Sequence, residues 1–310
     1  MHFTGTIWRP PYEAGSLLIE VTAGCTHHRC KFCTLYDDLP FSFRVSPMET
    51  VESDLAEAQM LCGAPDGRMR RRLFGLESQR FERAYLVGGN PFALSFARLA
   101  RLAGAIRRYF PGVASIGCFA RVTDAVSKTD GELRKLRQLG YDGLTIGVET
   151  GDEQALAFMD KGYTAKDILT QCSRLDEAGI GYHFFYLAGI SGAGRGKEGA
   201  ALSAKVFNRL HPRRIGSSML TVFPQSRLYQ DIQRGLWMEE SEMEKLDELQ
   251  ILIEQLAIPV YFASLGASNA LWVEGQLPRD REKLLGELHA FSLAYDEAAL
   301  RSYRDGLEHL

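Results

Sequence analysis

Three closely spaced cysteines are the residues of this sequence best suited to chemistry. The 310-residue chain has six cysteines, and Cys25, Cys30 and Cys33 fall within a span of nine residues. In a cytosolic chain, a tight group of cysteines more often binds metal than forms disulfides. Three thiolates on one loop can hold three irons of a [4Fe–4S] cluster and leave the fourth iron open to a ligand. The same cysteines with His27 or His28 would make a Cys3His zinc site, so the residues predict a metal and leave iron or zinc open.

Composition restricts the class of protein. Apolar residues make up 45% and charged residues 24%, which is typical of a globular protein and excludes a disordered or fibrous one. The 36 basic and 39 acidic side chains give a net charge of −3, so the chain is not built around bulk attraction to nucleic acid or anionic lipid. The longest apolar run, residues 184–190, is too short to cross a bilayer. No basic segment followed by an apolar one opens the sequence, so we expect a cytoplasmic protein with no membrane association.

The elements that position the cysteines are predicted from short apolar runs, which alternate with segments of helical periodicity. Strands are predicted at residues 17–22, 84–88, 115–120, 143–149, 182–189 and 216–223. Helices are predicted at residues 48–62, 91–109, 130–139, 152–159, 165–178 and 197–210. This alternation indicates right-handed βαβ units with parallel strands. Six units predict an α/β fold, a partial (βα)6 TIM-like barrel, with its active site at the carboxyl ends of the strands.

Unusual residues follow several of these strands at the expected active-site end. Gly88 and Gly89 end the second strand and let the backbone approach a ligand closely, although Gly-Gly before Asn-Pro is also a turn signal. Arg121 follows the third strand and can bind a carboxylate ligand or form a surface salt bridge. Glu149 ends the fourth strand, where it can accept hydroxyl donors, and Asp152 is the better cap for the next helix.

The cysteine segment resembles the radical S-adenosylmethionine (radical SAM) superfamily. An aromatic residue, Phe32, stands just before the last cysteine, and the resemblance runs from the first strand to the region of Pro224. The sequence at residues 9–14, 19–25 and 32–36 is similar to a branch near the elongator and methylthiotransferase-like radical SAM proteins. The spacing is Cys-x4-Cys-x2-Cys, whereas the common superfamily spacing is Cys-x3-Cys-x2-Cys. We therefore expect one extra loop residue and the same cofactor.

The resemblance implies a [4Fe–4S] cluster on the three cysteines and S-adenosylmethionine at its open iron. Such enzymes cleave S-adenosylmethionine reductively to a 5′-deoxyadenosyl radical, which takes a hydrogen atom from the substrate. The family's glycine-glycine-acid motif accepts from the cofactor's amino group through its backbone, and Asn90 stands here in place of the acid. Glu149 would lie near the ribose hydroxyls, Arg121 is a candidate for the methionyl carboxylate, and loop 189–197 would border the adenine. The implied cofactor-binding residues are Phe32, Gly88, Gly89, Asn90, Arg121 and Glu149.

The pattern changes after Pro224. Helices are predicted at residues 239–256 and 279–300, with a short edge strand at 258–263 between them. The predicted domains are a barrel at residues 1–225, with a lead-in at 1–16, and a mainly helical C-terminal extension at residues 226–310.

We expect a small-molecule substrate and an electron donor such as a flavodoxin. The basic run at residues 68–72, with Arg80 and Arg83, can dock an acidic donor, although such a run is usually a solvated face. Nucleic acid is not an expected partner, because the net charge is negative and acidic stretches such as residues 239–242 would repel phosphates if they face the barrel mouth. The alternatives are an RNA-modifying radical SAM enzyme and a zinc-binding structural or interaction protein.

Overall fold

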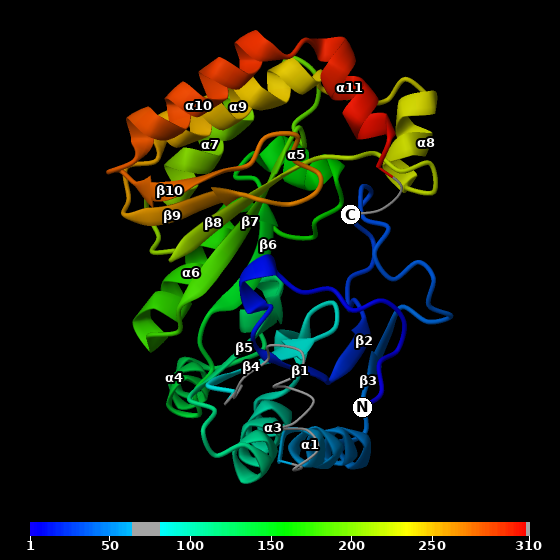
Figure 1. Cartoon of the computed structure of the whole chain (residues 1–310), viewed down its shortest axis with the longest axis vertical. Helices are drawn as coiled ribbons and strands as arrows, with labels where there is room; N and C mark the ends of the chain where they lie inside the picture. Colours follow the sequence, from blue (N-terminus) through cyan, green and yellow to red (C-terminus); the bar gives the residue numbers. More distant parts are fainter. Residues whose placement is uncertain (64–80, 308–310) are drawn as a thin grey trace. The chain divides into compact units, whose positions relative to one another are not determined.

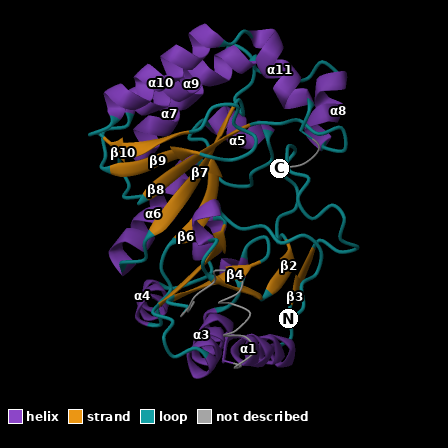
Figure 2. Cartoon of the chain, in the orientation of Figure 1, coloured by secondary structure: helices purple, strands orange, loops and turns teal. Residues whose placement is uncertain are grey.

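Parallel strands joined by helices make up most of the protein (Figures 1 and 2). The computed structural model describes residues 1–63 and 81–307. Two units can be distinguished along the chain, each containing parallel strands. The first comprises residues 1–26, 35–145 and 178–180, and the second comprises residues 27–34, 146–177 and 181–310.

The first unit contains three parallel strands in the order β1 (Leu17–Glu20), β4 (Arg83–Val87) and β5 (Ser115–Ala120). Strand β4 is buried over four consecutive residues, which is typical of a parallel strand covered on both faces. The helices of this unit are α1 (Met48–Gly63), α3 (Phe96–Tyr109) and α4 (Asp130–Gln138). Ser95 and Thr129 cap the last two helices, since each side chain accepts a backbone N–H from the first turn. A short antiparallel pair, β2 (Thr22–Gly24) and β3 (Phe43–Val45), follows β1.

The second unit contains β7 (Tyr182–Ala188), β8 (Arg214–Met219) and β9 (Val260–Ser264) in parallel, with β10 (Val273–Leu277) antiparallel to β9. Strand β6 (Leu144–Glu149) begins in the first unit and ends in the second. The helices are α5 (Glu153–Phe158), α6 (Ala165–Ala178), α7 (Gly196–Phe207), α8 (Arg227–Gln233), α9 (Glu242–Gln255), α10 (Arg281–Ala294) and α11 (Glu297–Asp305). Across the described ranges, none of these helices combines the length and apolar character needed to cross a bilayer.

Most of the predicted elements are present, and the differences have local causes. The six predicted strands correspond to β1, β4, β5, β6, β7 and β8, although β8 begins and ends earlier than predicted. The edge strand predicted at 258–263 is β9, but β10 pairs with it and occupies the edge. The helix predicted at 279–300 is two helices, because Asp296 caps α11 by accepting from the backbone N–H of Ala299.

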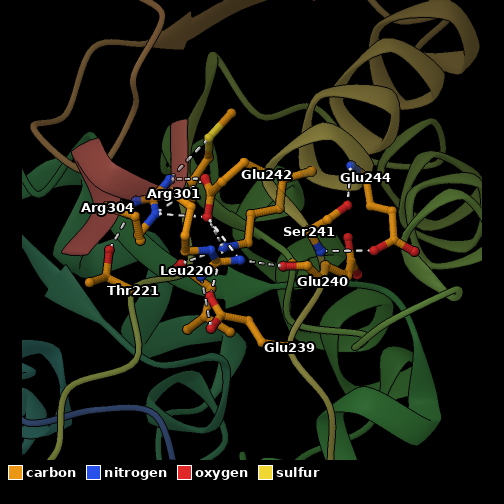
Figure 3. A network of polar contacts seen from close by, with 12 residues as sticks. Leu220, Thr221, Glu239, Glu240, Ser241, Glu242, Glu244, Arg301 and Arg304 are labelled. Carbon is orange, nitrogen blue, oxygen red and sulfur yellow. Dashed lines mark hydrogen bonds and ion pairs between the residues drawn. The ribbon is translucent and has the colours of Figure 1, made fainter. Parts of the chain in front are cut away.

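A buried ion-pair network joins the C-terminal helices to the end of β8 (Figure 3). Arg304 of α11 lies 2.7 Å from the carboxylate of Glu242, which begins α9. The same arginine donates to Thr221 Oγ1 at 3.0 Å, just past β8. Lys245 of α9 has no exposed side-chain surface and donates to the carbonyl oxygen of Leu220 at 3.0 Å. The network therefore anchors α9 and α11 at the carboxyl end of a sheet strand.

Candidate functional site

The cysteine loop begins in the first unit at a tight backbone contact. The β2–β3 pair brings Gly24 against Ser42, and the N–H of Cys25 donates to the Ser42 carbonyl at 2.8 Å. Gly24 has φ +76°, and a Cβ at this position would collide with the Ser42 carbonyl. Glycine is therefore required immediately before the first cysteine.

Gly88 and Gly89 at the end of β4 press against this same segment. A side chain at Gly88, which has φ +127°, would collide with Thr22. Gly89 donates its N–H to the Gly24 carbonyl at 3.0 Å, and a Cβ on it would lie 2.9 Å from the Cβ of Cys25. The sequence predicted that the two glycines let the backbone approach a ligand closely. In the structure, the close approach is to the chain's own backbone beside Cys25.

Asn90 is fully buried, and its side chain is engaged inside the first unit. Its amide bonds to Thr26 and to the carboxylate of Asp124, with distances between 2.7 and 3.1 Å. Arg121 donates its backbone N–H to the same carboxylate at 2.8 Å and its guanidinium to Thr123 Oγ1 at 3.2 Å. Arg121 is half-buried, so the sequence-predicted residues Asn90 and Arg121 meet at Asp124.

The rest of the cysteine loop, from His27 onward, belongs to the second unit and is held by the turn after α5. The N–H of Lys31 donates to the carbonyl of Met159 at 3.1 Å. Nε2 of His27 lies 2.5 Å from the carbonyl oxygen of Asp160. Asp160 has φ +54°. The turn that binds the loop therefore has a left-handed backbone conformation, which is uncommon for residues other than glycine.

The first turn of α8 holds the same loop from another element of the second unit. Leu228 donates its N–H to the Lys31 carbonyl at 2.8 Å. The ammonium of Lys31 lies 2.7 Å from the carboxylate of Asp231 and 3.7 Å from the ring centroid of Phe158. Next to Lys31, the N–H of Cys33 donates to the Cys30 carbonyl at 3.2 Å. The backbone that presents these two cysteines is therefore fixed by α5, α8 and a local turn.

Glu149 ends β6 and pairs with a buried lysine that the sequence analysis did not single out. Its backbone has φ +62°, a strained conformation for a non-glycine residue that is concentrated at functional sites. Its carboxylate lies 3.1 Å from Nζ of Lys161, whose side chain is only 6% exposed. Nζ of Lys161 also lies 5.5 Å from the ring centroids of Phe32 and Tyr163.

Charge, rather than burial, decides the state of Lys161. Burial by itself lowers the pKa of an ammonium group, but the electrostatic interaction with Glu149, with smaller contributions from Tyr163 and Cys30, raises the pKa of Lys161 above its ordinary value. Lys161 is therefore a fixed cation beside one cysteine and the predicted ribose-binding carboxylate. Asp152 caps α5 by accepting from the N–H of Gln154 at 2.9 Å, as predicted, and this leaves Glu149 outside the cap.

The glycine-rich loop after β7 is packed within the second unit. Ser191 and Arg195 both donate to the carboxylate of Asp152, at 3.1 and 2.9 Å. A Cβ at Gly192, which has φ +85°, would lie 2.7 Å from the indole nitrogen of Trp237. Ser191, Gly192, Arg195 and Trp237 border, with α5, a pocket of about 350 Å³.

The donor set fits a cluster held by thiolates. Cys25, Cys30 and Cys33 are half-buried, as cluster ligands open to a cofactor must be, whereas burial raises the pKa values of Cys118 and Cys172. Within residues 1–63 and 81–307, no three Cys, His, Asp or Glu side chains lie at the distances of a single bound metal ion. The three thiols are ligands of the kind that a [4Fe–4S] group takes, and the glycine at position 89 lets the backbone pack directly against Cys25.

Comparison with solved structures identifies the fold. Coproporphyrinogen III oxidase from Escherichia coli, a radical SAM enzyme, is similar with a TM-score of 0.53 and 20% identity, over 78% of this chain and 52% of that one. The radical SAM methyltransferase TsrM from Kitasatospora setae, with tryptophan and a SAM analogue bound, has a TM-score of 0.53 and 20% identity, over 72% of this chain and 40% of that one. Elp3 from the archaeon Methanocaldococcus infernus has a TM-score of 0.54 and 13% identity, over 90% of this chain and 63% of that one. The predicted α/β partial barrel is confirmed, and the chain spans about half the length of the oxidase.

The sequence comparison identifies the family. No curated protein matches the sequence. Residues 19–192, more than half of the chain, match the radical SAM superfamily, and this region contains all three cysteines of the loop. The chain therefore belongs to the radical SAM superfamily and is an enzyme of that class, whose cofactors are the predicted [4Fe–4S] cluster and S-adenosylmethionine.

Proposed function

We propose that this enzyme binds one [4Fe–4S] cluster through Cys25, Cys30 and Cys33 and acts on a small-molecule substrate. When bound, the cluster and S-adenosylmethionine supply the electron and the 5′-deoxyadenosyl radical that takes a hydrogen atom from the substrate. The protein's part is to fix the loop, orient the cofactor and exclude water. Residues 1–225 form the catalytic barrel in this proposal, and residues 226–310 are the extension that closes it.

The observation that carries the proposal is the Glu149–Lys161 pair on strained backbone beside Cys30 and Phe32. A carboxylate at a strand end can accept the two ribose hydroxyls of S-adenosylmethionine. The ammonium of Lys161 lies 3.1 Å from that carboxylate and places a positive charge beside it. Arg121 is the candidate to bind the methionyl carboxylate of S-adenosylmethionine, since a guanidinium group binds carboxylates bidentately.

The sequence suggested that the acidic stretch at residues 239–242 would repel the phosphates of RNA. The structure does not support this argument. Glu240 and Glu242 are buried, and Glu242 pairs with Lys245 and Arg304 inside the C-terminal network (Figure 3). These carboxylates therefore offer no repulsive face to phosphates. The small-molecule proposal depends instead on the net charge of −3, because proteins that bind RNA usually have a strong basic field.

The test of the cluster is anaerobic reconstitution with iron and sulfide. About four irons per chain are expected, as one cubane cluster requires, and 5′-deoxyadenosine should form from S-adenosylmethionine and reductant. Replacing Cys25, Cys30 and Cys33 by Ala should abolish both. The matched control replaces the isolated cysteines, Cys62, Cys118 and Cys172, and should retain iron. One zinc per chain and no colour would support the structural zinc protein instead.

The test of the substrate class is a titration with bulk tRNA at low and moderate salt. A protein that neutralises several phosphates loses affinity steeply, with log K falling by about 0.7–0.9 per contact against log salt. We expect no such binding. Tight, salt-sensitive binding that is lost when Arg70, Arg71 and Arg72 are changed to Glu would favour an RNA-modifying enzyme. This basic run, the proposed docking site of a flavodoxin-like donor, lies outside the described residues except for Arg83.

The proposed setting is the reducing cytoplasm, where thiols remain available as ligands. A cluster with an open iron is sensitive to oxygen, so the measurements on the loaded enzyme are made anaerobically. Arg83 itself pairs with the buried carboxylate of Glu13, at 2.7 Å within the first unit, so we assign it a structural role. The donor-docking proposal therefore depends on the run at residues 68–72 and Arg80.

A further inference from the structure

A buried polar bridge links the start of the cysteine loop to an acid on another segment of the first unit. Oδ1 of Asn90 accepts from the backbone N–H of Thr26 at 3.0 Å. Nδ2 of Asn90 donates to Thr26 Oγ1 at 2.7 Å and to the two carboxylate oxygens of Asp124 at 3.0 and 3.1 Å. Thr26 directly follows Cys25, so the bridge ends one residue from a proposed cluster ligand.

Asp124 is itself held in place and is nearly fully buried. It lies in a short 3-10 helix, Val122–Ala125, and accepts from the backbone N–H of Arg121 at 2.8 Å. Burial raises the pKa of Asp124 to about 6, while the hydrogen bonds from Arg121 and Asn90 and the charges of Arg121 and Lys128 act in the opposite direction. Above that pH the carboxylate is ionised and accepts from the amide of Asn90.

We propose that Asn90 and Asp124 are positioning residues that fix the Cys25 end of the cluster loop, and that the Asn90 side chain is not a cofactor ligand. The inference rests on the proposed function only in taking Cys25 as a cluster ligand. The place requires an amide, because one side chain must accept from the Thr26 N–H and donate to a carboxylate. An ionised acid at position 90 can accept but cannot donate, so the presence of Asp124 explains why Asn replaces the family's acid.

The backbone before Asn90 supports this assignment from the other side of Cys25. Gly89 donates to the Gly24 carbonyl at 3.0 Å and packs directly against Cys25. Two consecutive residues after β4 thus contact the two sequence neighbours of Cys25. Gly89 contacts Gly24, and Asn90 contacts Thr26. Loss of the Asn90 amide would break the contact with Thr26 and leave the contact between Gly89 and Gly24 intact.

The first experiment measures alkylation of the metal-free full-length protein by a maleimide under anaerobic conditions. Trypsin cleaves after Arg29 and Lys31, so the three loop cysteines fall on separate peptides that mass spectrometry can quantify individually. For Asn90→Ala we expect Cys25 to react about tenfold faster than in the wild type, because hydrogen bonds to the loop and to a charged group are lost. Cys33, which is held by contacts in the second unit, should react at an unchanged rate.

The matched control is Asn208→Ala. Asn208 also bridges two backbone groups with its amide, donating to the Gln255 carbonyl at 2.8 Å and accepting from the Ala257 N–H at 2.7 Å. This variant loses two side-chain-to-backbone hydrogen bonds at a half-buried position in the second unit and should leave the rate at Cys25 unchanged. An equal increase at Cys25 in both variants would mean general loosening of the fold and would overturn the proposal.

The second experiment is a charge exchange across the bridge. Asn90→Asp places two carboxylates together near Lys128 and should raise the rate at Cys25 and lower iron uptake on reconstitution, although it restores the family's acid. Adding Asp124→Asn to Asn90→Asp returns an amide and a carboxylate to the pair. We expect the double variant to recover most of the wild-type protection and iron content.

Two results would overturn the proposal. One is an Asn90→Asp variant that protects Cys25 and takes up iron as well as the wild type, which would show that position 90 does not require an amide. The other is a double variant no better than Asn90→Asp. If the wild type binds no cluster, the proposed function fails, but the alkylation rates of the metal-free protein still decide whether the bridge positions Cys25.

Discussion

Lys245 and Lys161 are both buried lysines of the second unit, and they differ in what surrounds the ammonium group. Nζ of Lys245 donates to the Leu220 carbonyl at 3.0 Å, to Glu239 at 2.9 Å and to Glu242 at 2.8 Å. An ammonium group has three protons, and each of these has an acceptor. Lys245 stands inside the helix α9, on regular backbone.

Lys161 lies beyond the end of α5, directly after a turn, and its carboxylate partner has a strained backbone. Glu149 is 3.1 Å from Nζ, and the rings of Phe32 and Tyr163 stand 5.5 Å away. Strained backbone persists only where the surrounding structure holds it, and it is frequent at ligand-binding sites. From this comparison we infer that Lys245 serves stability, and we propose that Lys161 serves the cofactor site. Four predictions test this contrast.

The largest expected effect is on folding, at Lys245. Lys245→Met should lower the free energy of unfolding by about 3–5 kcal/mol, because the Leu220 carbonyl, Glu239 and Glu242 each lose a charged donor, which leaves Arg301 and Arg304 to pair with the two carboxylates. Chemical denaturation followed by circular dichroism measures the change. The control is Lys197→Met, which removes an exposed partner of Asp247 and should leave stability unchanged. A Lys245→Met protein as stable as the wild type would remove one side of the contrast.

The next effect is on cofactor binding, at Lys161. Lys161→Met should weaken binding of S-adenosylmethionine to the reconstituted enzyme by about 1–3 kcal/mol, since a charged group that orients Glu149 is lost. Lys161→Arg keeps the charge and should recover part of the affinity. Equilibrium dialysis measures both, and Lys166→Met, at an exposed lysine of α6, is the control. Unchanged affinity in Lys161→Met, together with a stability loss as large as at Lys245, would make Lys161 a structural residue too.

The third effect is a pH dependence specific to the C-terminal network. Burial raises the pKa of Glu240, and the charge of Glu248 raises it further, while Lys245 acts in the opposite direction. Burial also raises the pKa of Glu248, against the hydrogen bonds from Tyr186 and Gly189. The folded protein therefore holds more protons than the unfolded chain from about pH 4.5 upward through the neutral range.

The sign follows from this difference in bound protons. The protonated pair of Glu240 and Glu248 contributes its full stability below the ordinary pKa of a glutamate side chain. This contribution is lost as the pH rises through the raised pKa values of the two groups. The free energy of unfolding should fall with pH by up to about 1.4 kcal/mol per unit for each proton released. Denaturation at pH 5.5, 7 and 8.5 measures the slope, and Glu240→Gln should flatten it. A slope that is unchanged in this variant would contradict the assignment.

Which features were predictable from sequence depends on how local their causes are. The strands and helices of the barrel were predicted because hydrophobic periodicity is written into consecutive residues. The β2–β3 pair was not predicted, since each strand is only three residues long and its register depends on a contact across the cysteine loop.

The candidate site shows the same limit. The cysteines and Glu149 were visible as a motif and a strand end, but Lys161 has no motif and is brought to Glu149 by a turn with positive φ at Asp160. The bond between Asn90 and Asp124 joins residues 34 positions apart. Such pairs depend on the tertiary fold, so residue types alone do not indicate them.

The smallest effect concerns the backbone at the two sites, and its sign should differ between them. At Glu149, both Ala and Gly remove the carboxylate and should weaken cofactor binding equally, but Gly tolerates φ +62° without strain. Glu149→Gly should therefore be more stable than Glu149→Ala by about 1 kcal/mol. At Lys245, inside α9, the order reverses, and Gly should be less stable than Ala by about 1 kcal/mol, because glycine is unfavourable within a helix. Because each comparison starts from a protein that already lacks the ion pair, the difference between Gly and Ala isolates the backbone. If Ala were more stable than Gly at position 149 as well, Glu149 would not be strained, and the backbone argument for its role in the site would be lost.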